Sequence, residues 1–260
     1  MSQTRSLVTG AAGFVGSHLC ERLLLEGHAV VGVDGLTDSY DLRIKYSNLE
    51  QFADHPQFTF VKGHLVDLKL DDLVSDSDYI FHLAARAGVR GGWGNIFDAY
   101  QHDNVTSTQR LFEVCRSSPR LRQFILASTS SIYGHNPPLP TPEDADLNPQ
   151  SYYAISKLSC EKLGEAYLQH FEVPITTLRF YTLYGPRQRP DMAFHIFLRA
   201  LMQDERITIF GDGAQTREVT YVQDAIDAIL LSLGDDRIGR IFNIGGGTYK
   251  KLNGYLDEIE

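Results

Sequence analysis

Short apolar runs alternate with longer amphipathic segments along the chain of 260 residues. Apolar runs bounded by turn-forming residues are typical of buried strands, and segments with apolar positions at helical spacing are typical of helices. The strands that this pattern predicts are Ser6–Thr9, Ala29–Asp34, Phe58–Lys62, Tyr79–Leu83, Gln123–Ser128, Ile175–Phe180 and Ile241–Ile244. The helices that it predicts are Gly13–Glu26, Asn95–Ser117, Ser151–Phe171, Ala193–Gln203 and Val222–Leu233.

Strands that alternate with helices predict an α/β fold, a Rossmann-type doubly wound parallel sheet with helices on both faces. The alternation stops after Phe180, in R-F-Y-T-L-Y-G-P-R-Q-R-P-D-M, where we expect a smaller C-terminal lobe to begin. The strand near Ile241 is expected to return to the main sheet, so that the two parts interleave. The predicted division is a Rossmann domain at residues 1–180, with 218–245 returning to it, and a lobe at residues 181–217 and 246–260.

The formal net charge of −9 narrows the range of partners. A nucleic-acid surface needs a basic patch, so the charge argues against nucleic-acid binding, whereas a few arginines could still hold a small anion. Cys20, Cys115 and Cys160 show no C-x-x-C spacing, which fits a reducing compartment with neither disulfides nor bound metal. No apolar run reaches membrane-spanning length, and the first strand begins too early to follow a signal peptide. We therefore expect a cytoplasmic protein without membrane segments.

Three glycines, Gly10, Gly13 and Gly16, form a G-x-x-G-x-x-G pattern between the first predicted strand and helix. Glycine lets the backbone approach a pyrophosphate, whose charge the N-terminus of the helix can meet. The alternative is a tight turn that needs glycine only for packing. Asp34 ends the next strand, 18 residues after Gly16. An acidic side chain there accepts hydrogen bonds from a ribose diol and repels a 2′-phosphate, which favours NAD over NADP.

Tyr153 and Lys157 stand four residues apart in S-Y-Y-A-I-S-K, so they share one face of a predicted helix. A free phenol has a pKa of about 10. A neighbouring ammonium and an oxidised nicotinamide would lower that pKa, so that the phenol could act as a base. Ser128 to Ser131 follow a predicted strand, at the end where ligands of parallel sheets bind. A hydroxyl there could hold a reacting alcohol oxygen, and the alternative for this run is a turn or a helix cap.

The remaining polar residues give weaker signals. His82 ends a predicted strand and is interpreted as structural, and the nine histidines show no metal-ligand spacing. Arg187, Arg189 and Arg217 are candidates for anion contacts, because guanidinium donates two parallel hydrogen bonds to phosphate or carboxylate. The alternative for each arginine is a solvated surface position.

Several segments together resemble the extended short-chain dehydrogenase/reductase family. They span residues 5 to about 249 and include V-T-G-A-A-G-F-V-G-S-H-L, H-L-A-A-R-A-G-V-R, S-T-S-S-I-Y-G, Y-A-I-S-K and F-G-D-G-A-Q-T-R-E-V-T-Y-V-Q-D. Within the family the chain is similar to nucleotide-sugar 4-epimerases, and most similar to those that act on UDP-glucuronate. D-S-Y-D and A-G-V-R look like that branch, and F-Y-T stands where UDP-galactose 4-epimerases usually carry asparagine.

The resemblance implies an NAD-dependent enzyme that epimerises a UDP-hexuronic acid at C4 through a transient 4-keto sugar. It implies that Thr129, Tyr153 and Lys157 are catalytic and that no metal takes part. The residues that it implies for NAD are Gly10, Gly13, Phe14, Val15, Gly16, Asp34, His64, Leu65, Leu83, Ala84, Ala85, Asn104, Tyr153 and Lys157. The residues that it implies for the UDP-sugar are Arg90, Thr129, Ser130, Ser131, Thr182, Arg189 and Arg217, with Arg189 at the C6 carboxylate and Arg217 at the diphosphate.

Other activities stay open. A sugar 4,6-dehydratase is disfavoured, because that branch carries Asp-Glu after the threonine and this chain carries Ser130 and Ser131. The alternatives that remain are a UDP-glucose/UDP-galactose 4-epimerase, a UDP-glucuronate decarboxylase and a dinucleotide-binding protein without turnover.

Two departures from the family pattern matter. His64 stands where the family commonly has an aspartate near the adenine, which would reshape that contact. The family also continues some tens of residues beyond residue 260, so we expect the substrate lobe to be incomplete at its C-terminus. The helices near 95–117 and 151–171 resemble those that pair subunits in the family, which predicts a homodimer.

Overall fold

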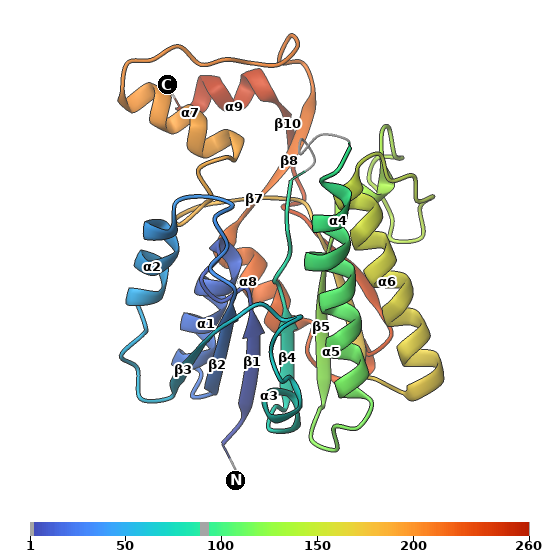
Figure 1. Cartoon of the computed structure of the whole chain (residues 1–260). Coiled ribbons are helices and arrows are strands. Elements are labelled where there is room, and N and C mark those ends of the chain that lie inside the picture. Colours follow the sequence, from blue (N-terminus) through green and yellow to red (C-terminus); the bar gives the residue numbers. More distant parts are fainter. Residues whose placement is uncertain (1–2, 89–93, 260) are drawn as a thin grey trace.

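The computed structural model describes residues 3–88 and 94–259, and within them seven parallel strands form one central sheet (Figure 1). The strands of this sheet are β1 (Arg5–Thr9), β2 (Ala29–Asp34), β3 (Phe58–Lys62), β4 (Tyr79–His82), β5 (Gln123–Thr129), β6 (Ile175–Phe180) and β9 (Ile241–Ile244). Their order is β3-β2-β1-β4-β5-β6-β9, and each neighbouring pair is parallel. The predicted Rossmann-type sheet is confirmed, including the return of the last strand beside β6.

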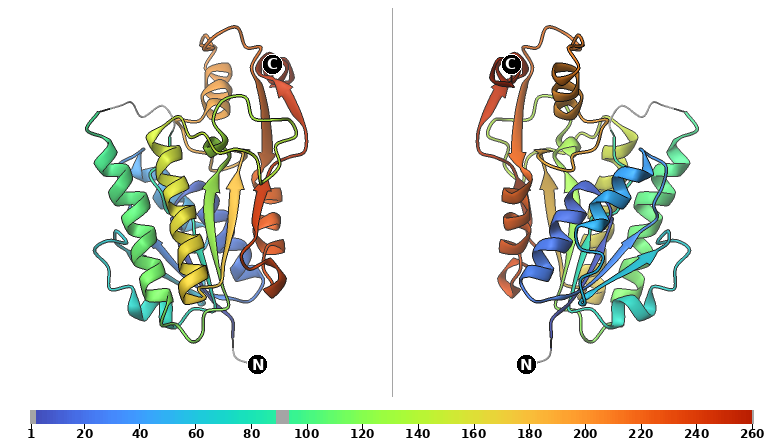
Figure 2. Two further views of the ribbon diagram at one scale, coloured as in Figure 1. Left: turned by 90° about the vertical axis from the view of Figure 1, so that its right-hand side faces the viewer. Right: turned by 90° about the vertical axis from the view of Figure 1, so that its left-hand side faces the viewer.

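Helices cover both faces of the sheet, as the side views in Figure 2 show. The longer helices of the sheet domain are α1 (Phe14–Leu25), α2 (Leu42–Glu50), α5 (Ser107–Cys115), α6 (Tyr152–Phe171) and α8 (Val222–Leu231), and a short α3 (Asp71–Ser75) precedes β4. Val8 packs with residues of α1 and α8, whereas its neighbour Leu7 packs with residues of α5 and α6. Burial on both faces explains why the strands are nearly continuous apolar runs.

The predicted single helix at Asn95–Ser117 is wrong in one respect. The structure has α4 (Phe97–Tyr100), a π-helix η1 (Gln101–Thr106) and then α5, so the segment is widened in its middle. Asn104 lies in the π-helix, where its side chain accepts from the Arg86 amide at 2.7 Å and donates to the Arg86 carbonyl at 3.1 Å and to Ser156 Oγ at 2.8 Å. These three hydrogen bonds offset the poorer backbone geometry of the widened turn.

A smaller lobe stands above the carboxyl ends of the central strands (Figure 1). It contains β7 (Thr182–Tyr184), β8 (Thr216–Tyr221) and β10 (Tyr249–Lys251) in a second sheet, with α7 (Ala193–Met202) and α9 (Leu252–Ile259). Phe197, Leu252 and Leu256 form a small core of its own. The domain limits at residues 180, 217 and 245 stay a prediction.

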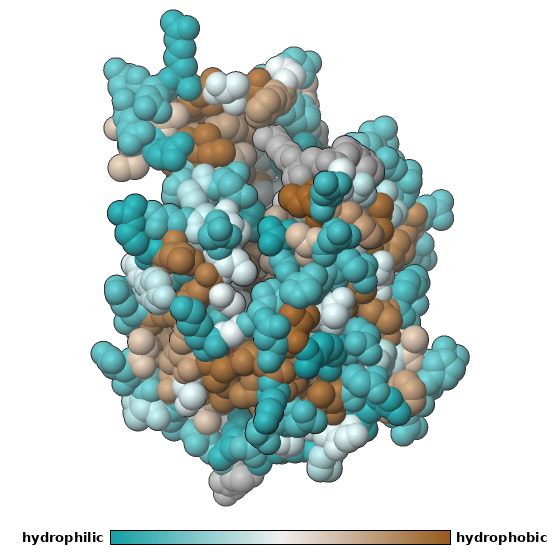
Figure 3. All heavy atoms as spheres, in the orientation of Figure 1, coloured by the Kyte–Doolittle hydropathy of each residue, from teal (hydrophilic) through white to brown (hydrophobic). Residues whose placement is uncertain are grey.

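Apolar atoms on the face shown in Figure 3 form several separate patches, some of them on the lobe. Met202 and Tyr249, both in the lobe, are 88% and 58% exposed. No helix in residues 3–88 and 94–259 is long and apolar enough to cross a bilayer.

Candidate active site

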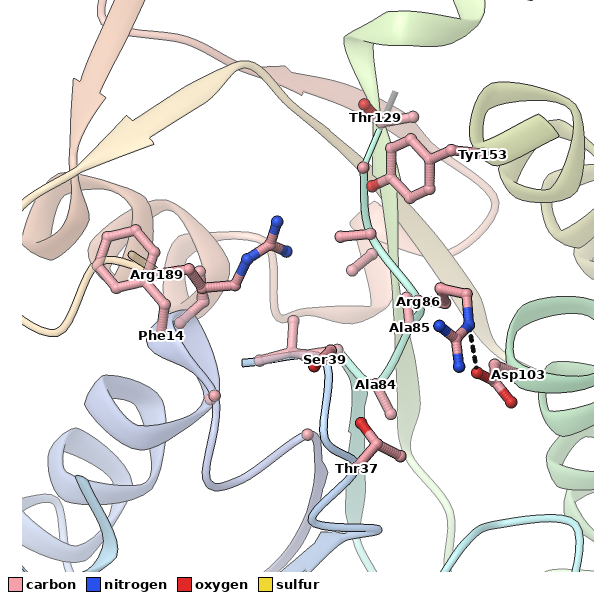
Figure 4. A pocket seen from close by; sticks show the side chains of 18 of the residues that line it. Phe14, Thr37, Ser39, Ala84, Ala85, Arg86, Asp103, Thr129, Tyr153 and Arg189 are labelled. Carbon is pink, nitrogen blue, oxygen red and sulfur yellow. Dashed lines mark hydrogen bonds and ion pairs between the residues drawn. The ribbon is translucent and has the colours of Figure 1, made fainter. Parts of the chain in front are cut away.

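A cavity of about 600 Å³ lies at the carboxyl ends of the central strands. It opens where the strand order reverses between β1 and β4, the usual ligand site of a doubly wound sheet. Figure 4 shows side chains from the sheet domain and from the segment leading to the lobe pointing into it. The predicted site residues that line it are Gly10, Gly13, Phe14, Val15, Gly16, Asp34, His64, Leu65, Leu83, Ala84, Ala85, Thr129, Ser130, Ser131, Tyr153, Lys157, Thr182 and Arg189.

The glycine loop is shaped for a close approach to the cavity. Gly10 has φ +74°, and a Cβ on it would meet the Ala84 amide nitrogen at 2.9 Å. A Cβ on Gly16 would lie 2.1 Å from the Gly10 carbonyl oxygen. Helix α1 begins just after Gly13 and has no acidic residue in its first turn. Phe14, Val15 and Gly16 of this first turn line the cavity, so no acidic side chain of the turn itself competes with a diphosphate for their amides.

Asp34 and a buried lysine form the polar end of the cavity. The Asp34 carboxylate accepts from the amides of Ala12 at 3.1 Å and Leu36 at 2.8 Å. Lys45 Nζ lies 3.4 Å from Asp34 Oδ1 and 3.5 Å from Thr37 Oγ1, and the lysine is 6% exposed. An acceptor and a donor side by side suit a ribose diol. The sequence predicted Asp34 but missed Lys45, because helix α2 was not predicted.

Tyr153, Lys157 and Thr129 meet on the opposite wall. Helix α6 begins at Tyr152, capped by Ser151 Oγ accepting from the Ala154 amide at 3.1 Å. This start places Tyr153 and Lys157 toward the cavity, and Figure 4 shows the phenol beside the Thr129 hydroxyl. Lys157 is 2% exposed, and its ammonium makes no hydrogen bond or ion pair with any other described residue. A buried cation without a protein partner is costly unless a ligand satisfies it.

Burial has the largest effect on the pKa values of Tyr153 and Lys157. Burial raises the pKa of Tyr153 above its ordinary value, while hydrogen bonding to Thr129 and the charge of Arg189 act to lower it. Burial likewise lowers the pKa of Lys157, and the Glu161 carboxylate acts in the opposite direction. The lowered phenol pKa predicted from sequence needs the lysine charge together with that of an oxidised nicotinamide, and it stays a prediction.

Arg189 enters the cavity from the segment before α7 (Figure 4). Its Nε and Nη2 donate to the Asp191 carboxylate at 3.0 and 2.8 Å. Its Nη1 makes no hydrogen bond to another described residue, so one amino group is available to an anion. By contrast, Arg187 is paired with Glu21 at 2.8 Å and does not line the cavity.

Three predicted contacts are not placed in the cavity. Asn104 lies behind its wall, with its amide fully used by Arg86 and Ser156. Arg217 is exposed on β8 and also lies away from the cavity. Arg90 falls outside the described residues. The roles given to these residues therefore stay predictions.

His64 lines the cavity within a cluster of ion pairs. His64 Nε2 and His102 Nδ1 lie 3.0 and 2.9 Å from Asp103 Oδ1, and Arg86 Nε donates to Asp103 Oδ2 at 2.7 Å. Burial alone would raise the pKa of Asp103, but hydrogen bonds from His102 and Arg86 hold it below its ordinary value. The donor atoms of the two histidines and the aspartate lie within 4.8 Å of one another. Because Arg86 already neutralises the carboxylate, we interpret the group as an ion-pair cluster.

His82, which the sequence interpreted as structural, holds a buried hydrogen-bond chain behind the cavity. The Thr108 hydroxyl donates to the Asn104 carbonyl, so the neutral His82 ring carries its proton on Nε2 and accepts at Nδ1 from the Thr9 hydroxyl at 2.8 Å. Thr9 Oγ1 in turn accepts from the Ala84 amide. His82 Nε2 then donates to Thr108 Oγ1 at 2.8 Å, and that hydroxyl donates to the Asn104 carbonyl at 2.6 Å. Burial, with a smaller contribution from the Lys157 charge, lowers the pKa of His82 to about 3.

This lowered pKa predicts a pH-dependent stability. The unfolded chain binds a proton at His82 near pH 6.5 and the folded chain only near pH 3, so stability is lost as the pH falls between these values. Between pH 6.5 and about 5, His82 should remove about 2 kcal/mol from the free energy of unfolding. Urea unfolding across this range should show a shallower decline for His82→Asn than for the wild type. Parallel curves would contradict the buried neutral histidine.

Comparison with known proteins agrees with this geometry. The model of the family described as "NAD dependent epimerase/dehydratase family" matches residues 6–245. An "Uncharacterized UDP-glucose epimerase YtcB" of Bacillus subtilis is 46% identical over 98% of this chain and 80% of its own length. A "UDP-glucuronate 4-epimerase" of Thermodesulfobacterium geofontis is 38% identical over 93% of this chain and 75% of its own.

A solved structure gives the same result at the level of the backbone. The UDP-glucuronic acid 4-epimerase of Bacillus cereus, in complex with UDP-glucuronic acid and NAD, has a TM-score of 0.93. It is 40% identical in sequence, and the match covers 98% of this chain and 82% of that protein. The family inferred from the sequence motifs is thereby confirmed: this chain belongs to the NAD dependent epimerase/dehydratase family.

Proposed function

We propose that this protein is an NAD-dependent 4-epimerase that interconverts UDP-glucuronate and UDP-galacturonate. The observation that carries the proposal is the convergence of Tyr153, Thr129 and Arg189 on one cavity, opposite the glycine loop. A base, a hydroxyl and a guanidinium suit an alcohol oxygen and a carboxylate on the same small substrate. Relatives named as UDP-glucuronate 4-epimerases support the same choice.

The residues of the cavity fit a dinucleotide. The N-terminus of α1 and the glycine loop would hold its diphosphate, and Asp34 with Lys45 would hold the ribose next to the adenine. Lys157, buried and without a protein partner among the described residues, would hold the ribose next to the nicotinamide. When bound, the dinucleotide supplies a hydride acceptor that becomes the donor in the return step.

Tyr153 would take the proton of the C4 hydroxyl and give it back after the sugar has turned over. Thr129 would hold the C4 oxygen: the Ser131 amide holds the Thr129 oxygen in place at 3.2 Å, and the Thr129 proton, which is donated to Ser131 Oγ at 3.2 Å, would turn to the sugar. Lys157 would stabilise the phenolate, which burial alone disfavours. The 4-keto sugar must rotate between the two half-reactions, so the contacts to the sugar should be weaker than those to the nucleotide.

The choice of sugar depends on Arg189, which gives a specific prediction. Arg189→Gln should lower kcat/KM for UDP-glucuronate by about 10²-fold, because a desolvated charge pair is lost. It should lower kcat/KM for UDP-glucose much less, since a hydroxymethyl group makes no such pair. Arg199→Gln removes the same charge from an exposed position on α7 and serves as the control. Equal losses for both sugars would contradict the assignment.

Incubation with UDP-glucuronate, UDP-glucose and UDP-xylose, followed by chromatography, tests the proposal against its rivals. UDP-galacturonate from UDP-glucuronate is the expected product. UDP-galactose from UDP-glucose alone would favour a UDP-glucose 4-epimerase, the activity for which the B. subtilis relative is named. UDP-xylose from UDP-glucuronate would indicate decarboxylation, and no product from any sugar would indicate a binding protein.

We also propose a homodimer formed through α4, α5 and α6. Phe97 on α4 and Ile155 and Phe171 on α6 are 38%, 37% and 44% exposed, which leaves apolar surface on two of these helices. Sedimentation equilibrium would show whether two chains associate. A location in the cytoplasm stays a prediction from the sequence.

A further inference from the structure

A buried ion pair outside the cavity joins helix α6 to strand β6. Arg179 Nε donates to Glu161 Oε1 at 3.1 Å, and its Nη2 donates to Oε2 at 2.8 Å. The two side chains are 3% and 1% exposed, so solvent does not screen them. Such a pair adds little net stability over apolar packing, yet loss of one partner is costly. The pair therefore matters chiefly for the segments that Arg179 and Glu161 hold in position.

The remaining amino group of Arg179 holds the turn that follows β5. Nη1 donates to the Tyr133 hydroxyl and to the Glu143 carbonyl, both at 2.7 Å. The Tyr133 hydroxyl in turn donates to Asn243 Oδ1 at 2.8 Å. The backbone amide of Asn243 donates to Glu143 Oε1, also at 2.8 Å. One guanidinium thus connects α6, β6, β9, the loop at Glu143 and the 3-10 turn η2 (Ser130–Tyr133).

Both ends of this network lead to the candidate active site. Glu161 lies one helical turn after Lys157 on α6, and its charge favours the protonated lysine against the effect of burial. Tyr133 ends η2, which begins directly after Thr129. Because Thr129 and Tyr153 belong to different segments, the distance between their hydroxyls depends on how η2 sits against α6.

We propose that Arg179 is a positioning residue, which with Glu161 and Tyr133 fixes the turn after β5 against helix α6. None of the three lines the cavity, so they act through Thr129 and the Tyr153 helix. The inference rests on the proposed function, in which the Thr129 and Tyr153 hydroxyls act on the same C4 oxygen and must therefore lie at a set distance from each other.

Tyr133→Phe tests this with a minimal change, since it removes only the hydroxyl that joins Arg179 to Asn243. We expect kcat to fall about 10-fold, because a small misplacement of reacting groups is enough for such a loss. KM for UDP-glucuronate should stay within about twofold of the wild type, because the lining of the cavity is unchanged. Hydrogen–deuterium exchange of residues 130–134 should become faster.

Tyr167→Phe is the matched control. Tyr167 lies on the same helix, and its hydroxyl bonds to Glu113 and Gln109, away from the network. Its loss should leave kcat and the exchange of residues 130–134 as in the wild type. Unchanged kcat and exchange in Tyr133→Phe, or an equal loss in Tyr167→Phe, would overturn the positioning role. Hydrogen–deuterium exchange needs no turnover, so it tests the positioning role even if the wild type epimerises no UDP-sugar. Absence of epimerisation in the wild type would contradict only the proposed function.

Glu161→Gln gives a second test, because a residue that only stabilised the fold would not change the pH dependence of kcat. The change removes the charge that supports the Lys157 ammonium, so the lysine should lose its proton at lower pH. The alkaline limb of the kcat profile should then shift to lower pH in the folded variant. Glu165→Gln, one turn later and bonded to Lys162, should leave the limb in place. An unmoved limb in a folded Glu161→Gln would contradict the coupling, and a variant that does not fold leaves the decision to Tyr133→Phe.

Discussion

Replacing Tyr153 by phenylalanine should lower kcat by about 10³-fold, the usual contribution of a positioned acid/base group. Tyr153 lines the cavity half-buried, and Thr129, to which its hydroxyl bonds, keeps its bonds to Ser131 when that hydroxyl is removed, so the fold should be weakened little. Binding of NAD, followed by fluorescence titration, should stay within about threefold of the wild type, because the ring itself is kept. The variant should therefore bind its ligands and fail to turn them over.

Tyr167→Phe is the control for this substitution. Tyr167 lies on the same helix, and its hydroxyl bonds to Gln109 and Glu113, outside the lining of the cavity. This variant should keep wild-type turnover. If Tyr153→Phe kept epimerisation within about threefold of the wild type, the phenol would not be the base.

The second large effect is expected at Gly16. A Cβ there would lie 2.1 Å from the Gly10 carbonyl oxygen and 2.8 Å from its carbon, so the backbone itself must move. Gly16→Ala should lower the free energy of unfolding by about 3 kcal/mol, as overpacking does. It should also weaken NAD binding by about 100-fold, because the loop and the N-terminus of α1 separate. Denaturant unfolding and calorimetric titration measure the two effects.

Gly254→Ala is the matched change at a glycine with open surroundings. It lies in α9, and a Cβ on it would meet nothing within 4 Å. Its free energy of unfolding should rise by up to about 1 kcal/mol, since alanine favours helix. NAD affinity that is unchanged in Gly16→Ala would mean that the glycine loop does not hold the diphosphate.

The sheet could be predicted from sequence because most of its strands are buried on both faces and are therefore nearly continuous apolar runs. Helix α2 could not, because its buried residues are Lys45, Asn48 and Leu49, so it lacks an apolar period. Lys45 was missed for that reason, although it lies beside Asp34. The strands of the lobe are short, and β10 is exposed at each position, so they carry no alternating pattern.

The site could be predicted where a motif fixes the backbone, as in the glycine loop and at the start of α6. It could not where a contact depends on packing between distant segments. The π-helix that turns Asn104 toward Arg86 leaves no mark on the helical period, and Arg217 was assigned by resemblance alone. The pKa of Tyr153 depends on burial, which the spacing of tyrosine and lysine does not report.

The proposed reaction requires hydrogen to leave C4 of the sugar and to return to the same carbon without exchange with water. Conversion of UDP-glucuronate that carries deuterium at C4, run in ordinary water and analysed by NMR and mass spectrometry, tests this directly. The expected product is UDP-galacturonate with the deuterium retained at C4. Loss of the deuterium to solvent, or a labelled pentose in place of the hexuronate, would contradict it.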